Sequence, residues 1–171
     1  REIRAETPHA LESVINESLR LLPPSYVLNP RIATEDTVLG GVEIPRGAMA
    51  MGSIIYRHRS RDAWGANADR FVPERWIGSP KPGTLDFMPF GQGPRRCLGD
   101  QFARLQLEVT IKNIIDHYWI EAPDGAVFDY VADAVLLRPK PCQLRLVSSK
   151  NPRCASPATI SGTLTRDLLR L

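Results

Sequence analysis

The stretch FMPFGQGPRRCLGD, residues 87–100, carries the most informative pattern in the chain. It places Cys97 directly after two arginines and two residues before a glycine, just ahead of a run with strong helical periodicity. A helix that begins near Cys97 would point its unpaired N–H groups and the positive end of its dipole toward the sulfur. Because the helix end and the arginines both favour a thiolate over a thiol, we expect Cys97 to be a ligand or a nucleophile.

The surroundings of Cys97 bear on the choice between these two roles. A nucleophilic cysteine needs a base, usually a histidine. The three histidines, His9, His58 and His117, show no spacing diagnostic of such a pair. The glycines near Cys97 let the backbone approach something flat, and Phe90 could close the loop from below. The residues alone leave both roles open.

A helix is predicted over residues 7–22, in TPHALESVINESLRLLPP. Thr7 is suited to cap its start and Pro8 to occupy its first turn, and Pro23–Pro24 would end it. One face collects apolar residues at helical spacing, namely Leu11, Val14, Ile15, Leu19 and Leu22. Glu17 and Arg20 share the opposite face, where a pair three residues apart could be no more than a solvent-exposed contact.

The rest of the chain alternates between strands, loops and one long helix. Residues 26–56 predict short strands, with a turn at Gly40–Gly41 and another near Gly47. Residues 60–76 predict a short helix and a meandering loop, and residues 77–96 little regular structure. A second helix is predicted from Cys97 or Leu98 to about Tyr118, with a buried stripe of Ala103, Leu107, Ile111, Ile114, Ile115 and Tyr118. Residues 135–138 and 143–147 would form a last hairpin.

Composition excludes several classes of protein. The 171 residues are 43% hydrophobic, which suits one globular domain. The net charge of +3 equals the charge of residues 150–171 alone, so no nucleic-acid partner is expected. Cys97, Cys142 and Cys154 are too few and too scattered for a disulfide framework or a zinc site. No signal peptide or membrane-spanning run is visible, so an intracellular location is expected, with any membrane association left open.

Three motifs carry a resemblance to a known family. FGQGPRRCLG resembles the heme-ligand signature of cytochromes P450, F-x-x-G-x-R-x-C-x-G, at every fixed position: Phe90, Gly93, Arg95, Cys97 and Gly99. ESLR, at Glu17–Arg20, looks like the family's E-x-x-R motif. FVPERW is similar to the family's Pro-Glu-Arg motif, with Arg75 in its last position. The three occur in the family's order, and the resemblance covers roughly residues 7–148.

The resemblance implies a role for each matched residue. Cys97 would be the axial thiolate ligand of heme b (iron protoporphyrin IX), with the Leu98 and Gly99 N–H groups hydrogen-bonded to the sulfur. Phe90 would pack against the porphyrin. Arg95 would pair with a heme propionate, Arg31 would serve as another propionate partner, and His58 is a weaker candidate for the same role. Glu17, Arg20 and Arg75 would form a buried structural network that fixes the loop carrying Cys97 (the cysteine loop). Gln106 stands where many members have Glu, which leaves the heme expectation intact.

The resemblance also implies a fold and a function. The fold would be mainly α with small β hairpins (α+β), with residues 1–149 forming the C-terminal portion of a cytochrome P450 domain and residues 150–171 a disordered tail or linker. The parent protein would be a monooxygenase that takes electrons from a reductase or ferredoxin and inserts one oxygen atom of O2 into a small apolar substrate. The long distal helix lies outside the sequence, so the chain alone is expected to be inactive. A heme-thiolate isomerase or peroxygenase, or an inactive heme-binding remnant, are the alternatives.

Overall fold

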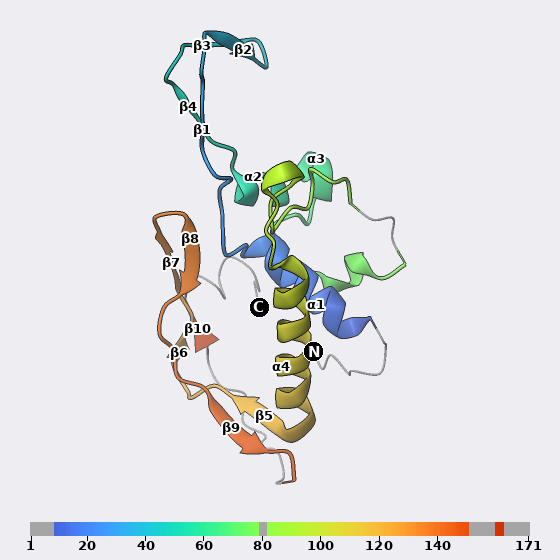
Figure 1. Cartoon of the computed structure of the whole chain (residues 1–171). Coiled ribbons are helices and arrows are strands. Elements are labelled where there is room, and N and C mark those ends of the chain that lie inside the picture. The colour runs from blue at the N-terminus through green and yellow to red at the C-terminus, as the bar shows by residue number, and fades with distance from the viewer. Residues whose placement is uncertain (1–8, 79–81, 151–159, 163–171) are drawn as a thin grey trace.

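The two longest elements are helices that lie against each other at the centre of the molecule (Figure 1). The structure is a computed structural model that describes residues 9–78, 82–150 and 160–162. The helical elements are α1 (Ala10–Leu21), α2 (Ile54–His58), α3 (Arg61–Trp64), η1 (Pro73–Trp76), η2 (Gly93–Arg95) and α4 (Asp100–His117). In the described segments ten short strands pair two by two into five small sheets. These helices with small β hairpins confirm the predicted fold class. Within those segments, no helix has the length and apolar character that crossing a membrane requires.

Helix α1 is enclosed on its polar face as well as on its apolar face. It ends at Leu21, which confirms the stop predicted from Pro23–Pro24, whereas the predicted start signals Thr7 and Pro8 lie outside the described residues. Its buried residues include the apolar Ile15 and Leu19 but also a polar row, Ser13, Glu17 and Arg20. The solvent-exposed alternative for Glu17 and Arg20 is therefore wrong, because η1 and α2 pack against this part of α1.

Helix α4 starts later and is less covered than predicted. It begins at Asp100 rather than at Cys97 or Leu98, with Gly99 at the N-cap position, and Tyr118 already belongs to a strand. The predicted buried stripe is only partly confirmed. Ala103, Ile111 and Ile114 are half-buried, but Leu107, Ile115 and Tyr118 are exposed. Periodicity identifies residues suited to burial, whereas burial requires an opposing surface, and the described residues cover only part of this helix.

Two small antiparallel sheets project away from the helices (Figure 1). Strand β1 (Arg31–Ile32) pairs with β4 (Met49–Ala50), and β2 (Thr37–Leu39) pairs with β3 (Val42–Ile44). The turn between β2 and β3 has positive φ angles at both Gly40 (59°) and Gly41 (84°). This is the backbone of a two-residue type I′ hairpin turn, which glycine adopts without steric cost, so the predicted turn is confirmed.

The pairing predicted for the C-terminal strands is wrong. The segment expected at residues 135–138 forms β8 (Leu136–Pro139) and pairs with β7 (Tyr130–Asp133), while β9 (Arg145–Ser148) pairs with β5 (Tyr118–Glu121). The β7–β8 turn consists of Ala134 and Val135, with Ala134 at φ 51°. No glycine marks this turn, so the sequence carried no signal for the hairpin that forms there.

The β7–β8 hairpin is held against the segment that follows α1. The Leu137 amide donates to the Pro24 carbonyl at 2.6 Å, and the Tyr26 hydroxyl donates to the Ala134 carbonyl at 2.6 Å. An antiparallel bridge between Ser25 and Leu136 lies between these contacts. Two segments more than a hundred residues apart in sequence therefore lie side by side.

One strand lies within residues 150–171, the segment expected to be a tail or linker. Strand β10 (Ile160–Ser161) pairs in parallel with β6 (Ala126–Val127), and the Phe128 amide donates to the Ser161 carbonyl at 2.8 Å. The rest of the tail beyond residue 150, including Cys154, lies outside the described residues. The division of the chain at residue 149 stays a prediction.

Candidate functional site

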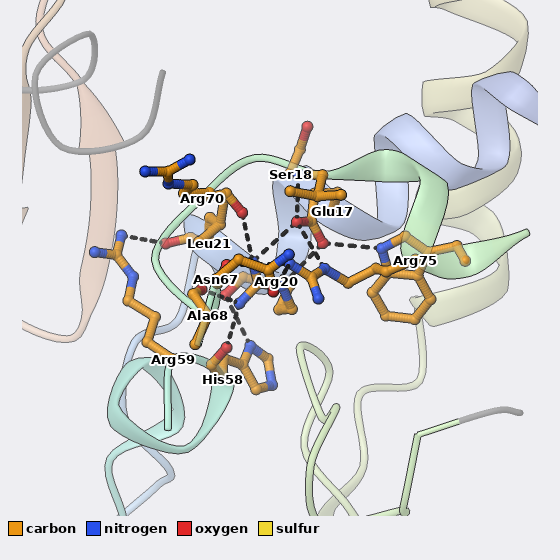
Figure 2. Close-up of polar contacts among 12 residues, drawn as sticks. Glu17, Ser18, Arg20, Leu21, His58, Arg59, Asn67, Ala68, Arg70 and Arg75 are labelled. Atoms are coloured by element: carbon orange, nitrogen blue, oxygen red, sulfur yellow. Dashed lines mark hydrogen bonds and ion pairs between the residues drawn. The ribbon is translucent and has the colours of Figure 1, made fainter. Parts of the chain in front are cut away.

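A buried ion pair joins Glu17 and Arg20 on the polar face of α1 (Figure 2). Both side chains are completely shielded from solvent. The guanidinium binds the carboxylate in a two-pronged arrangement, with Arg20 Nε 2.8 Å from Glu17 Oε2 and Arg20 Nη2 2.9 Å from Glu17 Oε1. This fork geometry is specific to arginine and is stronger than a hydrogen bond between neutral groups.

Arg20 uses all five of its N–H donors. Besides the two bonds to Glu17, its Nη1 donates to the carbonyls of His58 and Ala68, both at 2.6 Å, and its Nη2 donates to the Arg70 carbonyl at 3.0 Å. These carbonyls come from the end of α2 and from the loop before η1. One side chain on α1 therefore fixes the path of a loop that has little regular structure of its own.

Arg75 completes the set expected from the sequence. Its Nε lies 3.1 Å from Glu17 Oε1, and its Nη2 donates to the carbonyl and side-chain oxygens of Asn67 (Figure 2). Glu17 also accepts from the Val72 amide at 2.8 Å and from Trp76 Nε1 at 2.9 Å. Burial alone would raise the pKa of Glu17, but the hydrogen bonds from Arg20, Val72 and Trp76 hold that pKa below its ordinary value. The carboxylate is therefore stable in its charged form.

Aromatic rings cover this network on the side toward the cysteine loop. Arg20 lies 4.9 Å from the ring centre of Trp64, and Trp64 lies 5.6 Å from Trp76. Trp76 in turn contacts Phe87 at 4.6 Å between ring centres. Phe87 is the first residue of the quoted stretch that contains Cys97, so the rings join the network to that stretch.

His58 is a second link between the network and the cysteine loop. It is fully buried, its Nδ1 lies 3.1 Å from the Arg20 carbonyl, and its Nε2 lies 2.8 Å from the Met88 amide. The carbonyl only accepts and the amide only donates, which fixes a neutral ring with the proton on Nδ1. Burial lowers the pKa of His58 to about 4. Both ring nitrogens are used inside the protein, so the expected role of His58 as a propionate partner is wrong.

The cysteine loop, residues 90–97, is closed by backbone hydrogen bonds between its own residues. The Cys97 amide donates to the Phe90 carbonyl at 2.9 Å, and the Arg96 amide donates to the Gly93 carbonyl at 3.0 Å. Gly91 and Gly93 adopt φ angles of 71° and 68°, which other residues rarely adopt. The backbone conformation of this loop leaves Cys97 exposed.

Cys97 and its neighbours form an exposed surface. Cys97 and Arg95 are exposed, and the Leu98 side chain is fully exposed. A Cβ atom added to Gly99 would lie 3.9 Å from Cys97 Sγ, so the sulfur lies close to the backbone that leads into α4. A sulfur that is open on one side and adjacent to the first turn of a helix on the other fits the binding of a flat metal complex through one thiolate.

The positive charge expected beside Cys97 is partly neutralised. Arg96 Nε donates to Asp100 Oδ2 at 3.0 Å, and Arg96 Nη2 contacts the same oxygen. Arg104 Nε donates to Asp100 Oδ1 at 3.1 Å, and Arg104 Nη1 donates to Asn16 Oδ1 on α1 at 2.8 Å. Burial alone would raise the pKa of Asp100, but Arg96 and Arg104 hold it below its ordinary value. Arg96 therefore adds less positive charge beside Cys97 than the sequence predicted, because Asp100 pairs with it.

Arg31, the second expected propionate partner, does not belong to the cysteine loop. It begins β1 on the projecting sheets, is exposed, and donates through Nη1 to the carbonyls of Asn29 and Pro30. Among the described residues, none of these contacts reaches the cysteine loop. Sequence reasoning also missed Asp100 and Arg104, although their four-residue spacing in the predicted helix was a visible signal for paired charges on one helix face.

Comparisons with known proteins agree with this geometry. The family model for cytochrome P450 matches residues 9–146, and the chain therefore belongs to the cytochrome P450 family. It is 41% identical to a cytokinin hydroxylase of Arabidopsis thaliana over 109 residues, which cover 64% of this chain and 21% of that protein. It is 32% identical to cytochrome P450 3A25 of Mus musculus over 151 residues, which cover 85% of this chain and 29% of that protein. The matched part is thus less than a third of either relative.

Replacing Glu17 with alanine should destabilise the folded protein severely. The substitution leaves the fully buried charge of Arg20 and the partly buried charge of Arg75 without their carboxylate, which costs about 3–5 kcal/mol of unfolding free energy. The measurement is denaturant unfolding of the full natural chain with heme bound, together with its heme content. Glu12→Ala is the matched control, because Glu12 lies on the same helix with 68% of its side chain exposed. Equal stabilities for the two variants would contradict the role of Glu17.

His58 should make stability depend on pH between about 4 and 6.5. In this range the unfolded chain binds a proton at His58 that the folded chain does not, so the free energy of unfolding falls as the pH falls. The difference between 6.5 and the folded-state value of about 4 corresponds to about 3 kcal/mol. Melting temperatures measured from pH 7 to pH 4 should fall less steeply for His58→Gln than for the unsubstituted protein. His117→Gln, at an exposed site, should keep the original slope, and equal slopes for all three proteins would contradict this assignment.

Proposed function

We propose that this chain carries the proximal ligand loop of a heme-dependent monooxygenase, with Cys97 as the thiolate ligand. Cytochromes P450 are heme-thiolate proteins as a family, and membership of the chain in that family is shown by the match over residues 9–146. The observation that supports the assignment to Cys97 is its exposure on a glycine-shaped loop directly before α4. Cys142, the other cysteine of the described residues, lies in the connection between β8 and β9.

Several residues of this loop would hold the heme. Cys97 would bind the iron, and the N–H groups of Leu98 and Gly99 would donate to its sulfur. Phe90 would pack against the porphyrin. Gly93 faces open space, since a Cβ there would meet nothing within 4 Å, and its lack of a side chain would let the porphyrin approach the backbone. Arg95, exposed, would pair with a propionate. Arg31, which lies on β1 and outside this loop, would be a further propionate partner. When bound, a heme-thiolate centre supplies activation of O2 for insertion of one oxygen atom into a substrate.

The buried network would keep the loop in place for that task. Glu17 and Arg20 fix α1 to the loop before η1, and His58 then joins the Arg20 carbonyl to the Met88 amide. Met88 lies two residues before Phe90, whose carbonyl accepts from the Cys97 amide. The role of Glu17, Arg20 and Arg75 is therefore structural, since they would act on the ligand only through the backbone that carries it.

Two segments would face the substrate. The residues after Pro24 and the β7–β8 turn lie side by side. They are joined by the hydrogen bonds from the Leu137 amide to the Pro24 carbonyl and from the Tyr26 hydroxyl to the Ala134 carbonyl. This contact would give the substrate pocket a wall with a fixed shape. Apolar residues near it, Val27 and Leu136 among them, suit a small apolar substrate. A redox partner would supply the electrons, and residues outside this chain would supply the distal side of the pocket.

The alternatives gain no support. An isomerase or peroxygenase would use the same cysteine loop without an electron partner, and an inactive remnant would bind heme without reaction. The relatives compared above carry the names of a hydroxylase and of a cytochrome P450, which favours neither alternative. The monooxygenase proposal is the one that the family membership supports.

Replacing Cys97 with serine should abolish thiolate ligation. A serine oxygen is a hard and weakly donating ligand for heme iron, so the thiolate-specific absorption of the reduced carbonyl complex should disappear in the full natural chain, and monooxygenation with it. The measurement is a carbonyl difference spectrum for each variant. Cys142→Ser and Cys154→Ser are the matched controls and should keep the band. A surviving band in Cys97→Ser, or its loss in either control, would assign the ligand to another residue.

A further inference from the structure

A cluster of three charged side chains, Arg96, Asp100 and Arg104, lies where the cysteine loop leads into the first turns of α4. Asp100 is at its centre, 5% exposed, and its two oxygens bind Arg96 and Arg104 separately. Arg104 also bonds Asn16 on α1, which anchors this arginine to the core of the molecule. The carboxylate is therefore shared by two guanidinium groups, one from the residue four positions before it, in the cysteine loop, and one from the residue four positions after it, on α4.

Each arginine is next to a group of the cysteine loop. Arg96 precedes Cys97 in the chain, and Arg104 lies 5.2 Å from the ring centre of Phe90. The Phe90 carbonyl in turn accepts a hydrogen bond from the Cys97 amide at 2.9 Å. With one negative and two positive charges, the cluster keeps a net charge of about one positive unit beside the sulfur. Asp100 is the single acidic side chain in this cluster, so it controls how much positive charge the loop carries.

We propose that Asp100 is a positioning residue that holds Arg96 and Arg104 at the cysteine loop and balances their charge, and thereby sets the reduction potential of heme iron bound to Cys97. This inference rests on the proposed function of Cys97. Reduction adds one electron to the iron, so positive charge near the ligand favours the reduced form and negative charge favours the oxidised form. Removing the Asp100 charge should raise the potential, and removing the Arg104 charge should lower it.

The test is a potentiometric titration of the full natural chain with heme bound, followed by its absorption spectrum. Asp100→Asn keeps the size of the side chain and removes its charge, and we expect a shift to more positive potential. Arg104→Gln should shift the potential in the negative direction. Asp116→Asn is the matched control, because Asp116 lies on the same helix in an exposed pair with Lys112 and should leave the potential unchanged.

The signs of the two shifts separate this role from a merely structural one. Loosening of the loop would admit water to the heme in both variants and move both potentials in the same direction. Shifts of the same sign, or potentials equal to that of Asp116→Asn, would overturn the inference. If Asp100→Asn does not retain heme, the potential of Arg104→Gln tests the inference by itself. An unchanged or raised potential in Arg104→Gln would overturn the inference, and so would loss of heme from both variants. Absence of a thiolate carbonyl band in the unsubstituted protein would instead overturn the proposed function.

Discussion

The buried pair of Glu17 and Arg20 is the interaction on which the rest of the structure depends. Two charges without access to water are costly, and they persist here because every donor of Arg20 has an acceptor and Glu17 accepts from side chains and backbone alike. The same bonds hold the end of α2 and the loop before η1. The pair thus contributes less to net stability than to specifying one path for a loop without regular structure.

From this pair, two routes lead to Cys97. One passes through the neutral ring of His58 to the Met88 amide, and the other through the contact between the tilted rings of Trp76 and Phe87. Both end within the stretch that carries the cysteine. The loop itself is shaped by positive φ angles and by the bond between the Cys97 amide and the Phe90 carbonyl, so its conformation is fixed at both ends. A ligand held in this way needs little rearrangement when a metal complex binds.

Burial is concentrated around α1, whereas α4 and the projecting sheets expose many apolar side chains, Phe102 and Ile32 among them. The matched relatives are more than three times as long as the stretch they share with this chain. If Cys97 binds heme as proposed, the exposed face of α4, which begins beside the cysteine, would be covered by heme and by the remainder of the domain. The exposed apolar residues of α4 therefore suit the proposed function.

The sequence by itself determined the family, the ligand candidate, the Gly40–Gly41 hairpin and the residues of the buried network, because spaced motifs and glycine turns are local signals. Only the tertiary structure decided that the polar face of α1 is its most deeply buried, that β8 pairs with β7, and that His58 serves the network. It also decided that Asp100 takes up the charge of Arg96 beside Cys97. These outcomes depend on which surfaces and partners meet in space, and residues distant in sequence supply them, so no local pattern could specify them.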